Sequence, residues 1–237
     1  MHYNLLFNGC SFTAGGELEG INKDWEYQRT HRFSHVISQK TGLTYDNISQ
    51  SGASNDRILR TTVEWFEKGN TCDHAIIQWT LRNRIDYFSS ECFFPDKKPR
   101  YYPIHPHVDC RQYFNHRGRI IVMSYIDIQN NSNDQNNEDR CMYFMEKLLK
   151  DKCSFDYLKL EREPEVVSEY YELSPYHIYR TKFPIPHLRG DILSQNTDTE
   201  EYCSNYKGIN WLNGCHPNEL GHEKIADYII NNFDYFQ

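Results

Sequence analysis

Three short apolar segments in the first third of the chain each end in a turn. They cover residues 3–7, 43–48 and 72–79. The third is almost continuously apolar, with Ile76 and Ile77 near its centre, as expected of a central strand that is covered on both faces. The pattern therefore predicts three strands here, the third of them in the middle of a sheet.

Helical patterns separate these strands. Over residues 32–41 apolar side chains recur every three or four positions, and Gly42 follows as a stop signal. A second amphipathic pattern follows Ser54 and Asn55, either of which can cap the amino terminus of a helix. Because strands and helices alternate, we expect a parallel sheet with right-handed crossovers.

The second half of the chain adds further elements of both kinds. Residues 138–152 predict an amphipathic helix, residues 154–160 a fourth strand, and a last helix is expected to start at Pro217. Residues 119–128 are a strand or the start of a buried helix, since periodicity does not choose between them. The expected fold class is α/β, a three-layer sandwich with a central, mostly parallel sheet.

Long aperiodic stretches interrupt this pattern. They cover about residues 86–118 and 161–203, and we expect both to be irregular insertions of a single domain spanning residues 1–237. The polar residues 17–30 and 130–137 are also expected to be loops. A chain of 237 residues is long enough for one α/β domain with a substantial core.

Composition excludes some classes of function. The net charge of −7 argues against general nucleic-acid binding, because phosphate neutralisation needs concentrated Lys and Arg. No apolar run approaches the roughly 18 residues that a membrane span requires. The 8 cysteines have no CxxC spacing, and the amino terminus has no secretory pattern, so we expect reduced thiols and a cytoplasmic location.

The first predicted strand leads into a turn that presents one hydroxyl group. Residues 9–16 read GCSFTAGG, and the glycines let the backbone approach closely and leave N–H groups able to face an oxyanion. Ser11 is therefore a candidate nucleophile. The adjacent Cys10 is more simply a small buried hydrophobe, since neighbouring side chains in the turn point apart.

A base for this serine is expected from the other end of the chain. Residues 213–222 read NGCHPNELGH and place His216 just before the last helix, within reach of the carboxyl edge of a parallel sheet. We expect Ser11 Oγ to lie about 2.6–3.5 Å from an imidazole nitrogen of His216. His222 lies inside the helix and is expected to pack or cap rather than to catalyse.

These motifs together resemble the SGNH/GDSL hydrolases. Three segments resemble family blocks, namely GCSFT at 9–13, NISQSGASN at 47–55 and HPNELGH at 216–222. The resemblance implies a serine hydrolase in which Ser11 attacks, His216 carries the proton, and the N–H groups of Ser11 and Gly52 bind the oxyanion.

The third block departs from the family pattern. The family has Gly-x-Asn-Asp after its third strand, and the Asn side chain completes the oxyanion hole. This chain has QWTLRNR at residues 78–84. Thr80 is nearest to the expected place and is our candidate third donor, with Arg82 and Asn83 just beyond it.

The last block also differs. The family pattern is Asp-x-x-His, whereas Asn213 stands in the place of the aspartate. Its carbonyl can orient His216 but cannot stabilise an imidazolium by charge. The nearest carboxylates in the preceding sequence that can be recruited instead are Asp191 and Asp198.

Three more residues are candidate substrate contacts by position: Asn55, Trp79 and Arg82. Asn55 has an equally good alternative role as a helix cap. A metal site is not expected, because the metal-ligand types in the first insertion match no zinc spacing; they are His105, His107, Asp109, Cys110 and His116. No other cofactor is expected either.

The sequence therefore predicts an esterase or deacylase that cleaves a small-molecule or carbohydrate ester through an acyl-enzyme, without nucleic-acid or membrane partners. Two alternatives stay open. The chain can be a catalytically silent binding protein, given the two departures, or an acyltransferase onto a sugar hydroxyl, where a lid excludes water. Fold analogy does not name the substrate.

Overall fold

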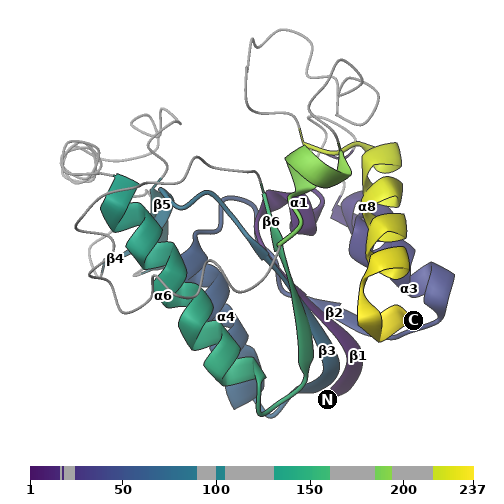
Figure 1. Ribbon diagram of the computed structural model, residues 1–237, viewed down its shortest axis with the longest axis horizontal. Coiled ribbons are helices and arrows are strands. Elements are labelled where there is room, and N and C mark those ends of the chain that lie inside the picture. The colour runs from purple at the N-terminus through teal and green to yellow at the C-terminus, as the bar shows by residue number, and fades with distance from the viewer. Residues whose placement is uncertain (17, 19–24, 90–99, 105–130, 161–184, 194–215) are drawn as a thin grey trace, which may run out of the picture.

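The computed structural model describes residues 1–16, 18, 25–89, 100–104, 131–160, 185–193 and 216–237. Its centre is a four-stranded sheet with the strand order β2-β1-β3-β6, in which all neighbouring strands are parallel (Figure 1). The strands are β1 (His2–Asn8), β2 (Tyr45–Asn47), β3 (Thr71–Trp79) and β6 (Ser154–Lys159). The predicted α/β class with a parallel central sheet is confirmed.

Helices cover both faces of this sheet. In Figure 1, α4 and α6 lie on one side of the strands, and α3 and α8 lie together on the other. Their bounds are α3 (Phe33–Thr41), α4 (Asn55–Glu67), α6 (Asn131–Leu149) and α8 (Glu219–Asn232). Three layers result, with apolar core residues on both faces of the sheet.

The ends of these helices follow from their capping residues. The Ser54 hydroxyl accepts a hydrogen bond from the Arg57 N–H at 3.2 Å and caps α4. Gly42 ends α3 at a φ of 74°, which a glycine adopts without strain. The last helix starts two residues later than expected, because Asn218 rather than Pro217 begins the capped turn of α8.

Several loop predictions were wrong. α2 (Trp25–His31) occupies the second part of the expected loop 17–30 and ends one residue beyond it. α6 begins at Asn131, inside the expected loop 130–137. β4 (Ile85–Ser89) and β5 (Arg100–Ile104) form an antiparallel pair that begins one residue before the first supposed insertion and otherwise lies within it. In each case the residues lack a clear period, so their secondary structure depends on contacts with distant parts of the chain.

The polar start of α6 shows how such contacts work. The Asn137 amide and the Arg140 guanidinium both donate to the Asp56 carboxylate on α4, at 3.2 Å and 3.1 Å. β4 is attached similarly, since the Asp86 carboxylate accepts from Ser54 Oγ at 3.1 Å and Arg60 Nη2 at 3.2 Å. Tertiary hydrogen bonds thus override weak local propensity.

Residues 119–128, with their open choice of strand or helix, lie outside the described residues, as does most of both supposed insertions. The single-domain prediction stays a prediction. Within residues 185–193 the chain forms the short π-helix η4 (Leu188–Ile192), and a 3₁₀ turn, η5 (Asp234–Phe236), follows α8. No helix in the described ranges has the length and apolar character needed to cross a membrane.

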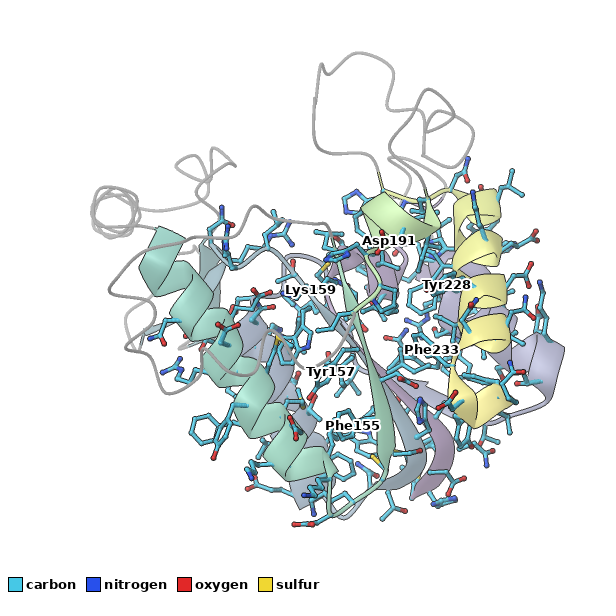
Figure 2. All side chains as sticks on the ribbon, viewed as in Figure 1. Phe155, Tyr157, Lys159, Asp191, Tyr228 and Phe233 are labelled. Atoms are coloured by element: carbon cyan, nitrogen blue, oxygen red, sulfur yellow. The ribbon has the colours of Figure 1, made fainter. Side chains whose placement is uncertain are left out.

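One nearly buried ion pair lies at the carboxyl end of β6. Lys159 Nζ is 3.1 Å from Glu138 Oε1 on α6, and the two side chains are 12% and 2% exposed. Figure 2 shows Lys159 at the end of β6 nearest η4, with Phe155 toward the other end. Because each charge is largely removed from water, each depends on the other for compensation.

Candidate active site

Ser11 follows the carboxyl end of β1, which is one of the two inner strands of the parallel sheet and lies between β2 and β3. Gly9 and Cys10 connect the strand to a single helical turn, α1 (Ser11–Ala14), of which Ser11 is the first residue. Gly15 closes that turn at a φ of 78°. The local structure therefore presents Ser11 above the sheet edge, with 8% of the residue exposed.

His216 meets this serine from the other end of the chain. Its Nε2 lies 2.7 Å from Ser11 Oγ across a separation of 205 residues. This distance falls within the range expected from the sequence. The Phe12 ring packs against the imidazole, with centroids 5.2 Å apart, and the Asn218 cap fixes the start of α8 two residues later. A hydroxyl and an imidazole are thus in hydrogen-bond contact at the edge where ligands bind in open α/β folds.

The neighbouring Cys10 lies farther from the reactive pair, with its Sγ 3.9 Å from Ser11 Oγ. It is fully buried, and its Sγ lies 3.2 Å from Gln78 Oε1. Its environment matches the small buried hydrophobe expected from the sequence, and the imidazole faces the hydroxyl rather than the thiol.

The other two expected oxyanion groups lie at the ends of the flanking strands. Gly52 follows β2 and has a φ of 80°. Thr80 directly follows β3, its Oγ1 accepts from Arg84 Nη1 at 2.9 Å, and its backbone N–H donates to Asn55 Oδ1 at 2.9 Å. The hydroxyl proton of Thr80 is therefore the group on this residue that can serve an oxyanion. The role itself stays a prediction.

The three candidate substrate contacts are all buried. Asn55 is fully buried, and its Nδ2 donates to the Thr80 carbonyl at 3.4 Å. Its side chain therefore binds both polar groups of the Thr80 backbone. The cap of α4 is Ser54 and not Asn55. Trp79 is fully buried and packs edge-on against Tyr157, because helices cover both faces of β3. Arg82 is 5% exposed. The structure places none of them on an open surface.

The groups proposed to orient His216 are only partly described. Asn213 and Asp198 lie outside the described residues, so the prediction for Asn213 stays a prediction. Asp191 accepts hydrogen bonds from the backbone N–H of His187 and contacts its Nδ1, both at 2.9 Å. The metal-ligand types of residues 105–116 are likewise outside the described residues; those described contain no group of three or more ligands suited to a metal.

His222 behaves as the sequence predicts, as a packing and capping residue. Its Nδ1 accepts a hydrogen bond from the Phe33 N–H at 3.1 Å, at the start of α3, and its ring stacks on Phe33. Complete burial, together with the proximity of His216 and Arg32, lowers the pKa of His222 to about 3. The imidazole is therefore neutral, with its proton on Nε2.

This burial predicts acid sensitivity. An unfolded histidine titrates near pH 6.5, so between pH 6.5 and about 3 the unfolded chain binds a proton that the folded chain does not. The free energy of unfolding should therefore decrease as the pH is lowered, and His222 should account for about 2 kcal/mol of the decrease between pH 7 and pH 5. His222→Asn keeps an acceptor for Phe33 N–H and should lose that part of the pH dependence. Urea titrations of both proteins at the two pH values measure it; equal losses would contradict the prediction.

Sequence reasoning missed a set of carboxamides beneath Ser11. Asn8, Asn47 and Gln78 all lie at or next to the carboxyl ends of β1, β2 and β3, and their side chains bind the turn that carries the serine. A signal was present in the sequence, since each of the three apolar segments has an Asn or Gln at or next to its carboxyl end. A polar residue at a buried strand end needs partners, and here they belong to the turn.

Comparison with solved structures supports the fold. The chain is similar to LAE5, an α/β hydrolase enzyme from the metagenome of Lake Arreo, Spain, with a TM-score of 0.50 and 14% identity over 99% of this chain and 96% of that one. The chain shares the fold of this hydrolase. No protein-family model matches the sequence, and no curated protein matches it by sequence.

Two further structures are similar at lower scores. One is a member of the lipolytic protein G-D-S-L family from Veillonella parvula, with a TM-score of 0.48, 11% identity and coverage of 98% of both chains. The other is an acetyl xylan esterase, Est2A, from the rumen bacterium Butyrivibrio proteoclasticus, with a TM-score of 0.45 and 13% identity. This chain covers 65% of the length of that enzyme, while 98% of this chain is matched.

Proposed function

We propose that this chain is a serine esterase or acyl hydrolase, a divergent member of the SGNH/GDSL hydrolases, that cleaves an ester or acetyl group through an acyl-enzyme. The observation that carries the proposal is the 2.7 Å contact between Ser11 Oγ and His216 Nε2 at the carboxyl edge of a parallel sheet. A serine hydroxyl needs such a base, because it is a weak nucleophile while it keeps its proton.

Acylation uses this contact directly. Ser11 Oγ bonds to the ester carbonyl carbon while its proton passes to His216 Nε2, and the carbonyl π electrons move to the oxygen. When the tetrahedral intermediate collapses, the bond to the leaving alcohol breaks, and His216 returns the proton to that alkoxide. In the second half, a water molecule attacks the acyl-enzyme with His216 again as base, and Ser11 leaves as a protonated hydroxyl.

The oxyanion needs hydrogen-bond donors close to Ser11. We assign the backbone N–H of Ser11 as the first donor; among the described residues, no backbone carbonyl outside its own helical turn accepts a hydrogen bond from it. We assign the N–H of Gly52 and the hydroxyl of Thr80 as further donors, as the family resemblance implies. Each such donor commonly contributes about 10²–10³-fold to kcat.

Two features support the proposed role of His216 as the base. His222 stays neutral because burial lowers its pKa to about 3, so it adds no second positive charge beside His216. Asn213 is proposed to accept the Nδ1–H of His216 and hold the reactive tautomer, as a neutral substitute for the family aspartate. The substrate is proposed to be a small-molecule or carbohydrate ester.

Covalent labelling tests this proposal. A fluorophosphonate probe should modify wild-type protein at Ser11, as located by peptide mass, and Ser11→Ala should remain unlabelled. Cys10→Ala is the matched control at the adjacent position and should still be labelled. Absence of labelling, together with no hydrolysis of short-chain esters or acetylated glycans, would refute the hydrolase proposal and favour the silent binding protein.

A further inference from the structure

Gln78, near the end of the central strand β3, is fully buried directly beneath the turn that carries Ser11. Its Oε1 accepts a hydrogen bond from the backbone N–H of Cys10 at 3.0 Å and from the Thr13 hydroxyl at 3.1 Å. Its Nε2 donates to the carbonyl of Trp79 at 2.6 Å. Since a backbone N–H is always a donor, these contacts fix which end of the amide faces the turn.

Two other amides complete the support. Asn8 Oδ1 accepts from the Gly9 N–H at 2.9 Å, and Asn8 Nδ2 donates to Ile58 O on α4 at 2.9 Å. Asn47 Nδ2 donates to the Thr13 carbonyl at 3.0 Å. Gly9, Cys10 and Thr13, on both sides of the serine, are therefore each held by an amide from a different strand end.

The turn is packed tightly against Gln78. A Cβ on Gly9 would lie 2.5 Å from Thr13 Oγ1 and 2.8 Å from Gln78 Oε1, so only glycine allows this approach. The amides bind the flanking backbone and not the N–H of Ser11 itself. The support thus constrains the orientation of the nucleophile without occupying the groups that it needs.

We propose that Gln78 is a positioning residue for Ser11: it holds the Cys10 peptide and Thr13 so that Ser11 Oγ meets His216 Nε2. The proposal rests on the function proposed above. A neutral amide suits this role better than a carboxylate, because an ionised carboxylate has no proton to donate to the Trp79 carbonyl, and its negative charge would repel the oxyanion that forms beside Ser11. A displacement of about 1 Å at a reacting group can cost about 10²-fold in rate.

The first test is Gln78→Met, which keeps length and burial but removes the hydrogen bonds. With the folded fraction checked by circular dichroism, the fluorophosphonate labelling rate and kcat should fall by about 10–100-fold, while KM changes little. His74→Phe is the matched control: His74 is a buried polar residue near the other end of β3, bonded to Ser154 Oγ at 2.8 Å. It should lose stability without a change in the labelling rate of the folded protein.

The second variant, Gln78→Glu, distinguishes positioning from a general packing defect. When protonated, its hydroxyl donates to the Trp79 carbonyl and its other oxygen accepts from Cys10 N–H, so the native bonds survive. When ionised, it has no proton for that carbonyl. The ratio of the variant to the wild-type labelling rate should therefore fall as pH rises, whereas a packing defect alone would give a constant ratio.

A third measurement does not depend on activity. The imidazole NMR signals of His216 report its contact with Ser11, and they should shift toward those of Ser11→Ala in Gln78→Met but not in His74→Phe. If the wild type neither reacts with the probe nor cleaves esters, the hydrolase proposal fails, and these spectra still decide the positioning role. Wild-type labelling in Gln78→Met, or unchanged His216 signals, would overturn the role of Gln78.

Discussion

Replacing His216 with glutamine should lower kcat for an ester substrate by about 10⁴–10⁶-fold, because His216 Nε2, 2.7 Å from Ser11 Oγ, is the base that the described residues place in contact with this hydroxyl. The folded state should persist, since His216 is only partly buried and precedes α8 rather than lying within it. Steady-state kinetics on the purified variant, with unfolding curves recorded alongside, measures both effects.

His187→Gln provides the control for that experiment. His187 is also an imidazole beside the sheet, paired by a parallel bridge with Lys159 at the end of β6, and it has its own carboxylate partner in Asp191. Its replacement should leave kcat nearly unchanged. Activity that survives in His216→Gln but disappears in His187→Gln would transfer the role of base to His187.

Lys159→Met should lower the free energy of unfolding by about 3–5 kcal/mol, the largest stability effect that we expect from a single side chain. The change leaves Glu138 buried at 2% exposure without the ammonium that lies 3.1 Å from it. An uncompensated buried carboxylate must either protonate or draw in water, and both destabilise the folded state. Urea denaturation followed by circular dichroism measures the loss.

Two further variants separate this effect from a general loss of charge. Adding Glu138→Leu to Lys159→Met should recover most of the stability, since it removes the stranded charge. Lys40→Met removes an exposed ion pair between Lys40 and Asp227, in which the two side chains are 42% and 55% exposed. This change should lower the free energy of unfolding by less than about 1 kcal/mol. Equal losses in Lys40→Met and Lys159→Met would show that burial of the pair does not matter.

The elements that sequence reasoning found are those whose signal is local. β1 and β3 each contain a short apolar run, at residues 5–7 and 75–77, and α3 ends at a glycine that adopts a positive φ. α2, the first turns of α6 and the β4–β5 pair have no such signal. Asp56 binds Arg140 of α6, 84 residues away in sequence, and Asp86 of β4 binds Arg60, 26 residues away. A pattern read over a short stretch of sequence cannot reveal such contacts.

The candidate site divides in the same way. Ser11 and His216 were identified from short motifs, and the parallel topology then implied that they meet. The contacts of Gln78 and Asn55 were not predicted, because they join the ends of different elements that lie 25 and 68 residues apart in sequence. Trp79 was expected to face a substrate, but a strand covered on both faces buries its alternate side chains equally, and Trp79 lies inside.

The separation of 205 residues between Ser11 and His216 has a consequence for biosynthesis. The ribosome makes the serine directly after β1 and the histidine only just before α8, when the four described strands of the central sheet have already been synthesised. Nascent chains that have not yet docked α8 against α3 contain an unactivated serine. The reactivity of Ser11 toward a fluorophosphonate should then appear only when the segment with His216 and α8 has docked. The same probe can therefore measure the time at which folding is complete.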